Sequence, residues 1–153
     1  GNVWYNEPKT LDTAFDVMGD IVLSTAAQQY GGFTVPEVDK ILAPYAKKSY
    51  DKYVQEFLQY SDKSWTGREE KAIEYALDKV RRDFDQGWQG IEYKLNTVGS
   101  SRGDYPFVTV TLGLGTGQFE KMCNISLLEV HKGGQGRDGH KKAGSFPENR
   151  ISL

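Results

Sequence analysis

The side chains best suited to act as a nucleophile or a soft metal ligand are one cysteine and two histidines: Cys123, His131 and His140. A thiol beside an imidazole can form an activated nucleophile. His131 follows Cys123 by eight residues in a predicted strand, which would separate the two by roughly 27 Å. No spacing in the sequence brings His140 back to Cys123. A cysteine within an apolar segment usually packs as a small hydrophobe, so we predict no catalytic residue.

Metal-ligand residue types cluster only where Asp138 lies between His131 and His140, in a glycine-rich segment. Two histidines and one carboxylate without helical or hairpin spacing are a weak indication of a metal site. Residues 62–67 begin like a calcium-binding loop, but the twelfth position is Ile73, where a bidentate glutamate is required. We therefore predict no metal site and no other cofactor.

The glycine run at residues 113–117 (Gly-Leu-Gly-Thr-Gly) could cradle a phosphate group. That chemistry requires the glycines to lie between a strand and the N-terminus of a helix, where free amides and the helix dipole face the anion. The residues that follow are predicted to form another strand. We therefore interpret residues 113–117 as a wide hairpin loop.

Two tripeptides match short recognition motifs. Residues 102–104 (Arg-Gly-Asp) resemble the integrin-binding tripeptide and lie in a predicted exposed loop. Residues 133–135 (Gly-Gly-Gln) resemble the tripeptide of peptide-chain release factors, but the surrounding family context is absent. The Gly-Asp pair of residues 103–104 is also common in ordinary turns. Only Arg102 and Asp104 are kept as candidate binding residues.

Aromatic side chains are abundant, with nine Tyr, seven Phe and three Trp. Several of them occupy more than one face of the second predicted helix. Two apolar faces imply two contacts, one with the core and one with either a neighbouring helix or a partner protein. The candidate binding residues on this helix are Tyr45, Tyr50, Tyr53 and Tyr60. The alternative is that the helix lies between other helices.

Apolar residues in the first half of the sequence recur every three or four positions, which is typical of amphipathic helices. The first predicted helix follows an N-cap at Thr10 and ends before the glycine pair at residues 31–32. Another follows a capping box at residues 66–69 and ends at Gly87.

The second predicted helix lies between these two. It follows a capping box at residues 34–37 and runs to about Tyr60. Pro44 lacks an amide hydrogen and crowds the preceding turn, so a break or kink is expected beside it.

The second half of the sequence alternates apolar and polar residues, which predicts strands. Strands are expected at residues 91–95, 107–112 and 119–130, the last with a bulge near Leu127. The predicted fold class is α+β, with three to four N-terminal helices packed on one face of a three- to four-stranded antiparallel meander. An extended Gly-rich C-terminal tail follows. The predicted domains are a single α+β domain at residues 1–131 and a polar Gly/Lys-rich tail at 132–153.

Size and charge limit the class of protein. The chain has 153 residues and a net charge of −2, which predicts one domain whose body does not bind nucleic acid. No apolar run is long enough to span a membrane. One cysteine permits no disulfide within the chain. The chain starts at Gly1 without methionine, which slightly favours an exported or periplasmic protein.

No motif in the sequence identifies an activity. The favoured interpretation is a non-catalytic binding protein, of an exported or envelope-associated bacterial type, that holds a protein partner. The alternative is a small-molecule-binding or enzymatic domain with a pocket between helices and sheet, since such pockets leave no linear motif. The sequence does not indicate an oligomeric state.

Overall fold

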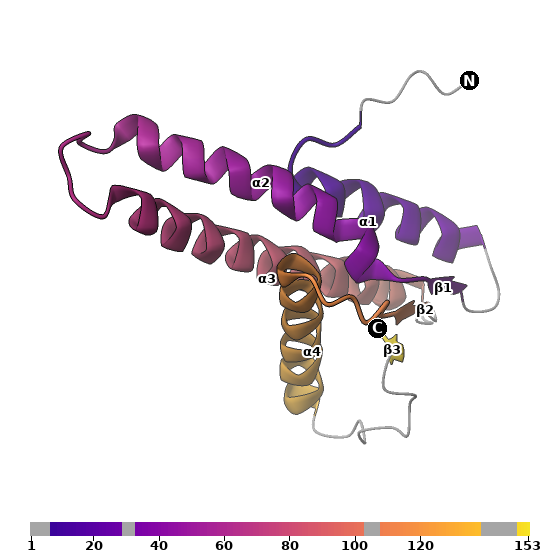
Figure 1. The fold of residues 1–153 in the computed structure, drawn as a ribbon. Helices are drawn as coiled ribbons and strands as arrows, with labels where there is room; N and C mark the ends of the chain where they lie inside the picture. Colours follow the sequence, from indigo (N-terminus) through magenta and orange to yellow (C-terminus); the bar gives the residue numbers. More distant parts are fainter. Residues whose placement is uncertain (1–6, 29–32, 103–107, 139–149) are drawn as a thin grey trace.

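The protein is mainly helical, with a small sheet at one end of the helices (Figure 1). The structure is a computed structural model that describes residues 7–28, 33–102, 108–138 and 150–153. Its elements, in chain order, are α1 (Leu11–Gln28), β1 (Phe33–Val35), α2 (Val38–Tyr60), α3 (Arg68–Arg102), β2 (Val108–Thr111), α4 (Gln118–Asp138) and β3 (Arg150–Ser152).

The three N-terminal helices pack on one another, and α4 crosses them. Helices α2 and α3 form a long antiparallel hairpin, α1 lies beside both, and α4 contacts α2 and α3 (Figure 1). The centre of the core is aromatic: Phe15 of α1 meets Phe84 and Trp88 of α3 edge to face, with ring centroids 6.1 and 5.1 Å apart. These edge-to-face contacts add to the apolar area that the rings bury.

The predicted antiparallel meander is wrong. The sheet has the order β1-β2-β3, with β1 parallel to β2 and β2 antiparallel to β3. Of the expected strands only residues 107–112 are confirmed, as β2 at Val108–Thr111. The parallel pair requires a long crossover between its strands, and α2 and α3 provide it.

The strand predicted at residues 91–95 is instead part of α3. The buried residues Val80, Phe84, Trp88, Ile91 and Leu95 follow one another at intervals of three or four, which is the helical period. Tyr93, which completed the apparent alternation, is 72% exposed. The helix therefore continues past the end predicted for it.

Gly87 does not end α3 but lets it pack closely on α1. A Cβ atom placed on Gly87 would overlap the ring of Phe15. The glycine is thus required by the close approach of two helices, not by a turn.

The strand predicted at residues 119–130 is helix α4. Met122, Cys123, Ser126 and Leu127 are buried, and Ile125 between them is 56% exposed. The phase shift that suggested a bulge at Leu127 is the 3.6-residue repeat of a helix. The expected extended tail is also corrected, because α4 continues to Asp138 and residues 150–152 form β3. The domain boundary placed after residue 131 stays a prediction.

The predicted helix starts were confirmed for α1 but not for α2. The first helix is confirmed, with the Thr13 amide donating to the Thr10 hydroxyl at 3.4 Å. The capping box at residues 34–37 is wrong, because β1 occupies Phe33–Val35 and α2 starts after Glu37. Helix α2 continues through Pro44 as one helix.

Candidate functional site

The glycine loop, residues 113–117, connects β2 to α4 and is held by a buried carboxylate, Asp39. Asp39 lies in the first turn of α2 and is 0% exposed. The Gly113 amide donates to Asp39 Oδ1 at 2.5 Å, and the Gly115 amide donates to Oδ2 at 2.9 Å. Asn124 of α4 donates its side-chain amide to the same Oδ2 at 3.4 Å. One carboxylate thus joins α2, the glycine loop and α4.

The backbone of the loop is shaped to bind this carboxylate. Leu114 has a φ of 54°, so it lies in the left-handed region between the two donating amides. A left-handed residue turns neighbouring amides toward one point and forms an anion-binding concavity. Here the anion is the Asp39 side chain.

Hydrogen bonding keeps Asp39 ionised. Burial by itself raises the pKa of this carboxyl group, because the charged form loses hydration. The amides of Gly115 and Gly113, the Asn124 side chain and the Lys40 amide outweigh that effect, so the pKa lies below its ordinary value of 3.8. A fixed negative charge therefore lies under the loop at neutral pH.

The glycines of the loop are required by close contacts. A Cβ on Gly113 would lie 2.8 Å from Asp39 Oδ1 and 2.9 Å from Lys40 Cε. A Cβ on Gly115 would overlap the carboxylate of Glu120, which lies in the first turn of α4. A side chain at Gly113 would therefore disturb the Asp39 contact, whereas one at Gly115 would require the Glu120 side chain to move.

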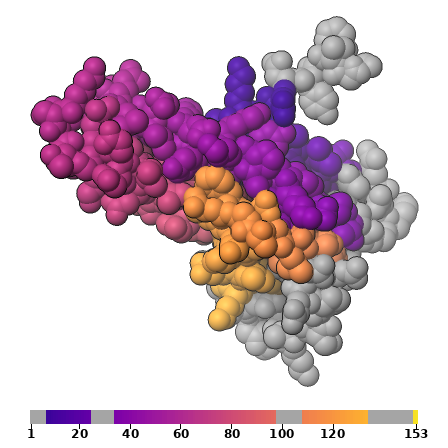
Figure 2. Space-filling view, viewed as in Figure 1, coloured from indigo at the N-terminus to yellow at the C-terminus, as the bar shows by residue number. Residues whose placement is uncertain are grey.

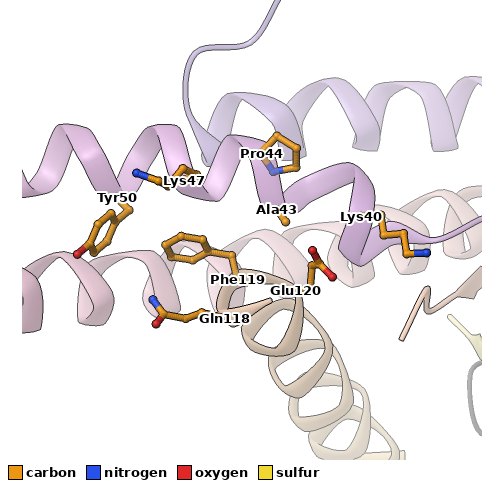
Figure 3. Close-up of a pocket in the computed structure, with 8 residues that line it drawn as sticks. All are labelled: Lys40, Ala43, Pro44, Lys47, Tyr50, Gln118, Phe119 and Glu120. Carbon is orange, nitrogen blue, oxygen red and sulfur yellow. The ribbon is translucent and has the colours of Figure 1, made fainter. Parts of the chain in front are cut away.

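A groove of about 620 Å³, called here the α2–α4 groove, lies beside the glycine loop. Figure 2 shows the first turns of α4 against the side of α2, where this groove lies. The groove combines two lysines of α2 with apolar side chains and with the first residues of α4 (Figure 3). Its lining residues are Lys40, Ala43, Pro44, Lys47, Tyr50, Gln118, Phe119 and Glu120.

The groove lysines are held by surface ion pairs. Lys40 Nζ lies 3.3 Å from Glu37, and Lys47 Nζ lies 2.5 Å from Asp51. All four side chains are more than half exposed. Such pairs are weak in water, so a more highly charged anion can compete for both ammonium groups.

A second pocket of about 550 Å³ lies between α3 and α4 on the other side of Gln118. Its lining includes two basic side chains, Arg81 and Lys121, and two acidic side chains, Asp85 and Glu129. The Ser126 hydroxyl donates to Asp85 at 2.5 Å in this pocket. Neither of the two pockets lies between helices and sheet, where the sequence placed one.

The tyrosines predicted as a binding surface do not form one surface. Tyr50 lines the α2–α4 groove and packs on Phe119, with ring centroids 5.5 Å apart. Tyr53 donates to Asp83 of α3 at 2.5 Å, Tyr45 donates to Glu7 at 3.4 Å, and Tyr60 is 83% exposed. The alternative, a helix placed between other helices, matches α2, which contacts α1, α3 and α4. A binding role for these tyrosines stays a prediction.

The remaining sequence candidates lie apart from the groove. Arg102 is the last residue of α3, and Asp104 lies outside the described residues. Their binding role also stays a prediction. His140 likewise falls outside the described ranges, and His131 Nδ1 lies 3.4 Å from Glu92 Oε1. Within residues 7–28, 33–102, 108–138 and 150–153, no three His, Cys, Asp or Glu side chains could hold a metal ion.

Cys123 is wholly buried beneath the site. Burial raises the pKa of its thiol well above the ordinary value, and the charge of Asp39 raises it further. The neighbouring Trp88 side chain lowers the pKa only in part. Cys123 is therefore a protonated thiol at neutral pH and part of the core.

The structure reveals Asp39 and the glycine loop as the site that sequence reasoning missed. The glycine run itself was the signal, but the phosphate-loop interpretation was rejected because a strand was expected after it. A helix follows instead, so the run has the strand–loop–helix context that an anion-binding loop requires. Asp39 is 74 residues from Gly113 in sequence, and no local pattern connects them.

Comparison with known proteins relates the whole chain to one enzyme family. The family model described as anaerobic ribonucleoside-triphosphate reductase matches residues 1–153. Proteins of that name from Enterobacteria phage T4, Salmonella typhimurium and Haemophilus influenzae are 37%, 30% and 30% identical to it. The matches cover 100%, 97% and 92% of this chain, but only 25%, 20% and 19% of the relatives. The chain thus spans about a quarter or less of their length.

These similarities correct the functional interpretation of the sequence. The interpretation of the chain as a non-catalytic binding protein is wrong, because the family it matches is described as a reductase. The residues that the structure describes contain no helix long and apolar enough to cross a membrane. The expected protein partner is untested.

Proposed function

Because this chain belongs to the anaerobic ribonucleoside-triphosphate reductase family, we propose that it forms part of an enzyme that reduces ribonucleoside triphosphates. Within that enzyme, the α2–α4 groove binds the nucleotide by its triphosphate. The observation that carries this proposal is the meeting of two lysines with the N-terminus of α4 in one groove.

Charge supports binding of a polyphosphate in the groove. Lys40 and Lys47 lie two turns apart on α2 and supply two positive charges (Figure 3). Helix α4 points its N-terminus into the same groove through Gln118 and Phe119. The unpaired amides and the dipole at a helix N-terminus favour anions.

The apolar part of the groove supports binding of the nucleoside. Ala43, Pro44, Tyr50 and Phe119 form a surface on which a base or a ribose can lie. Ligand sites typically combine such a surface with a few polar groups that fix orientation. None of the eight lining residues is a cysteine, so the groove contains no thiol that could reduce a ligand. We therefore propose that the groove binds and orients the nucleotide and does not reduce it.

Glu120 opposes an anion in the groove and limits where it can bind. Its carboxylate lies against Gly115 and Gly117 of the glycine loop. The phosphates are therefore proposed to lie away from Glu120, between the two lysines and the amides of Gln118 and Phe119. A nucleotide would replace the ion pairs of the lysines with Glu37 and Asp51, which are exposed and weak.

Replacing Lys47 by alanine is expected to weaken binding of a ribonucleoside triphosphate about tenfold, which corresponds to about 1.4 kcal/mol. Binding of the matching unphosphorylated nucleoside should change little, because the lysine contacts only phosphate. The measurement is calorimetric titration of the complete polypeptide that contains this chain.

Lys52→Ala is the matched control, since Lys52 is an exposed lysine of the same helix that does not line the groove. The proposal requires Lys47→Ala alone to weaken triphosphate binding. Equal affinities of the two variants would refute it.

A further inference from the structure

We infer that Asp39 is a positioning residue for the nucleotide groove: it fixes the glycine loop and the start of α4 against α2, so that Lys40 and the α4 N-terminus face one ligand. This inference rests on the proposed function. It assigns Asp39 no direct contact with the nucleotide, since the side chain is wholly buried.

The first support is that Asp39 connects both walls of the groove. Lys40, Lys47 and Tyr50 belong to α2, as Asp39 does, whereas Gln118 and Phe119 belong to α4. The carboxylate binds the loop that leads into α4 through Gly113 and Gly115, and it binds α4 itself through Asn124. Bonds to this one side chain therefore help to fix the two walls of the groove relative to each other at this end.

The second support is backbone strain on both sides of the carboxylate. Glu37 has a φ of 47° and Leu114 a φ of 54°, and they are the two non-glycine residues with positive φ in the part of the chain that the structure describes. Glu37 precedes Asp39 by two residues, and Leu114 lies between its two amide donors. Such conformations cost free energy, persist where surrounding contacts impose them, and cluster at functional sites.

The third support is the path from Asp39 to a groove lysine. A Cβ on Gly113 would lie 2.9 and 3.0 Å from Lys40 Cε and Cδ, so the Lys40 side chain packs across the glycine that Asp39 binds. A shift of the loop would displace that stem and its ammonium group. Asp39 thus acts on the ligand through the loop and Lys40.

The alternative is that Asp39 only stabilises the fold. Asp83 provides a matched control for that role, because it is a partly buried carboxylate that accepts a hydrogen bond from Tyr53 of α2. Asp83 also joins two helices, but it does not line the groove. Asp83→Asn therefore shows whether loss of a carboxylate that joins two helices is by itself enough to weaken nucleotide binding, whereas positioning of the groove depends on Asp39.

The test compares Asp39→Asn with Asp83→Asn in the complete polypeptide. Asparagine keeps the shape of aspartate but has one acceptor oxygen, and its amide would face a second N–H donor. We expect Asp39→Asn to weaken ribonucleoside triphosphate binding about tenfold, because the site is no longer preorganised. KM should rise with kcat nearly unchanged, hydrogen exchange at the Gly113 and Gly115 amides should accelerate, and Asp83→Asn should keep wild-type affinity.

A second variant covers the case in which Asp39→Asn does not fold. Gly113→Ala keeps the carboxylate but places a methyl group 2.8 Å from Asp39 Oδ1, which displaces the loop. It should weaken the same binding. Wild-type affinity in Asp39→Asn, or in Gly113→Ala where the first variant is unfolded, would overturn the inference, as would equal weakening in Asp83→Asn.

The two proposals fail in different ways. Wild-type affinity in Lys47→Ala would contradict the groove as the nucleotide site. Weaker binding in Lys47→Ala together with unchanged binding in Asp39→Asn would retain the site and contradict only the role of Asp39.

Discussion

Replacing Gly87 by alanine is expected to destabilise the folded protein by about 1–3 kcal/mol, the usual cost of forcing an extra methyl group into a packed core. At an open helix position the same substitution stabilises, because glycine has more conformational freedom to lose on folding. The new Cβ at residue 87 would overlap the ring of Phe15. That ring is held edge to face between Phe84 and Trp88 and cannot move aside easily.

Gly90 of the same helix is the matched control. Nothing lies within 4 Å of a Cβ placed there, so Gly90→Ala should stabilise by roughly 0.5–1 kcal/mol. Urea unfolding of both variants measures the two effects. Opposite signs are expected, and stabilisation by both substitutions would show that α1 and α3 do not approach each other at residue 87.

Replacing Asp39 by alanine is expected to destabilise the protein by about 3 kcal/mol at neutral pH. The substitution leaves the part-buried amides of Gly113 and Gly115 without their acceptor, and a lost hydrogen bond to a charged group costs about 1.5–3 kcal/mol. Thermal and urea unfolding measure the change. A loss no larger than that of an exposed substitution such as Lys52→Ala would contradict the described geometry.

The pH dependence of this effect has a defined sign. The pKa of Asp39 is lower in the folded state than its ordinary value of 3.8, so its ionised form is the one that folding stabilises. Its contribution is fully present above pH 3.8 and is lost as the pH falls through the lower folded-state pKa. The difference in unfolding free energy between wild type and Asp39→Ala should therefore shrink below pH 3.8. A difference that grows on acidification would contradict the assignment.

Local sequence patterns predicted the secondary structure of the first half of the chain better than that of the second half. The first helix follows from Thr10 and a long apolar stripe, and both are present in the structure. Residues 91–95 were misassigned because Ile91 and Leu95, four residues apart, fit either a strand or a helix. Five residues do not distinguish the two periods, whereas the continuous spacing from Val80 to Leu95 does.

The candidate site was missed because the helix and strand periods were also confused in the segment that forms α4. Cys123 and Leu127 are four residues apart and buried, as a helix requires, but the exposed Ile125 and Leu128 made the segment resemble a bulged strand. Because a strand was predicted in place of α4, the glycine run was not expected to precede the N-terminus of a helix. The Asp39 contacts depend on tertiary packing and could not be read from spacing.

The measurement that tests the central claim most directly is amide NMR of the polypeptide during titration with a ribonucleoside triphosphate. The proposed site predicts that the largest chemical-shift changes occur in residues 113–120, with smaller changes at Lys47 and Tyr50 and none near Asp83. The unphosphorylated nucleoside should shift residues 113–120 much less, because the amides of Gln118 and Phe119 are proposed to face the phosphates. Saturable binding that shifts only residues away from the α2–α4 groove would contradict the proposed site.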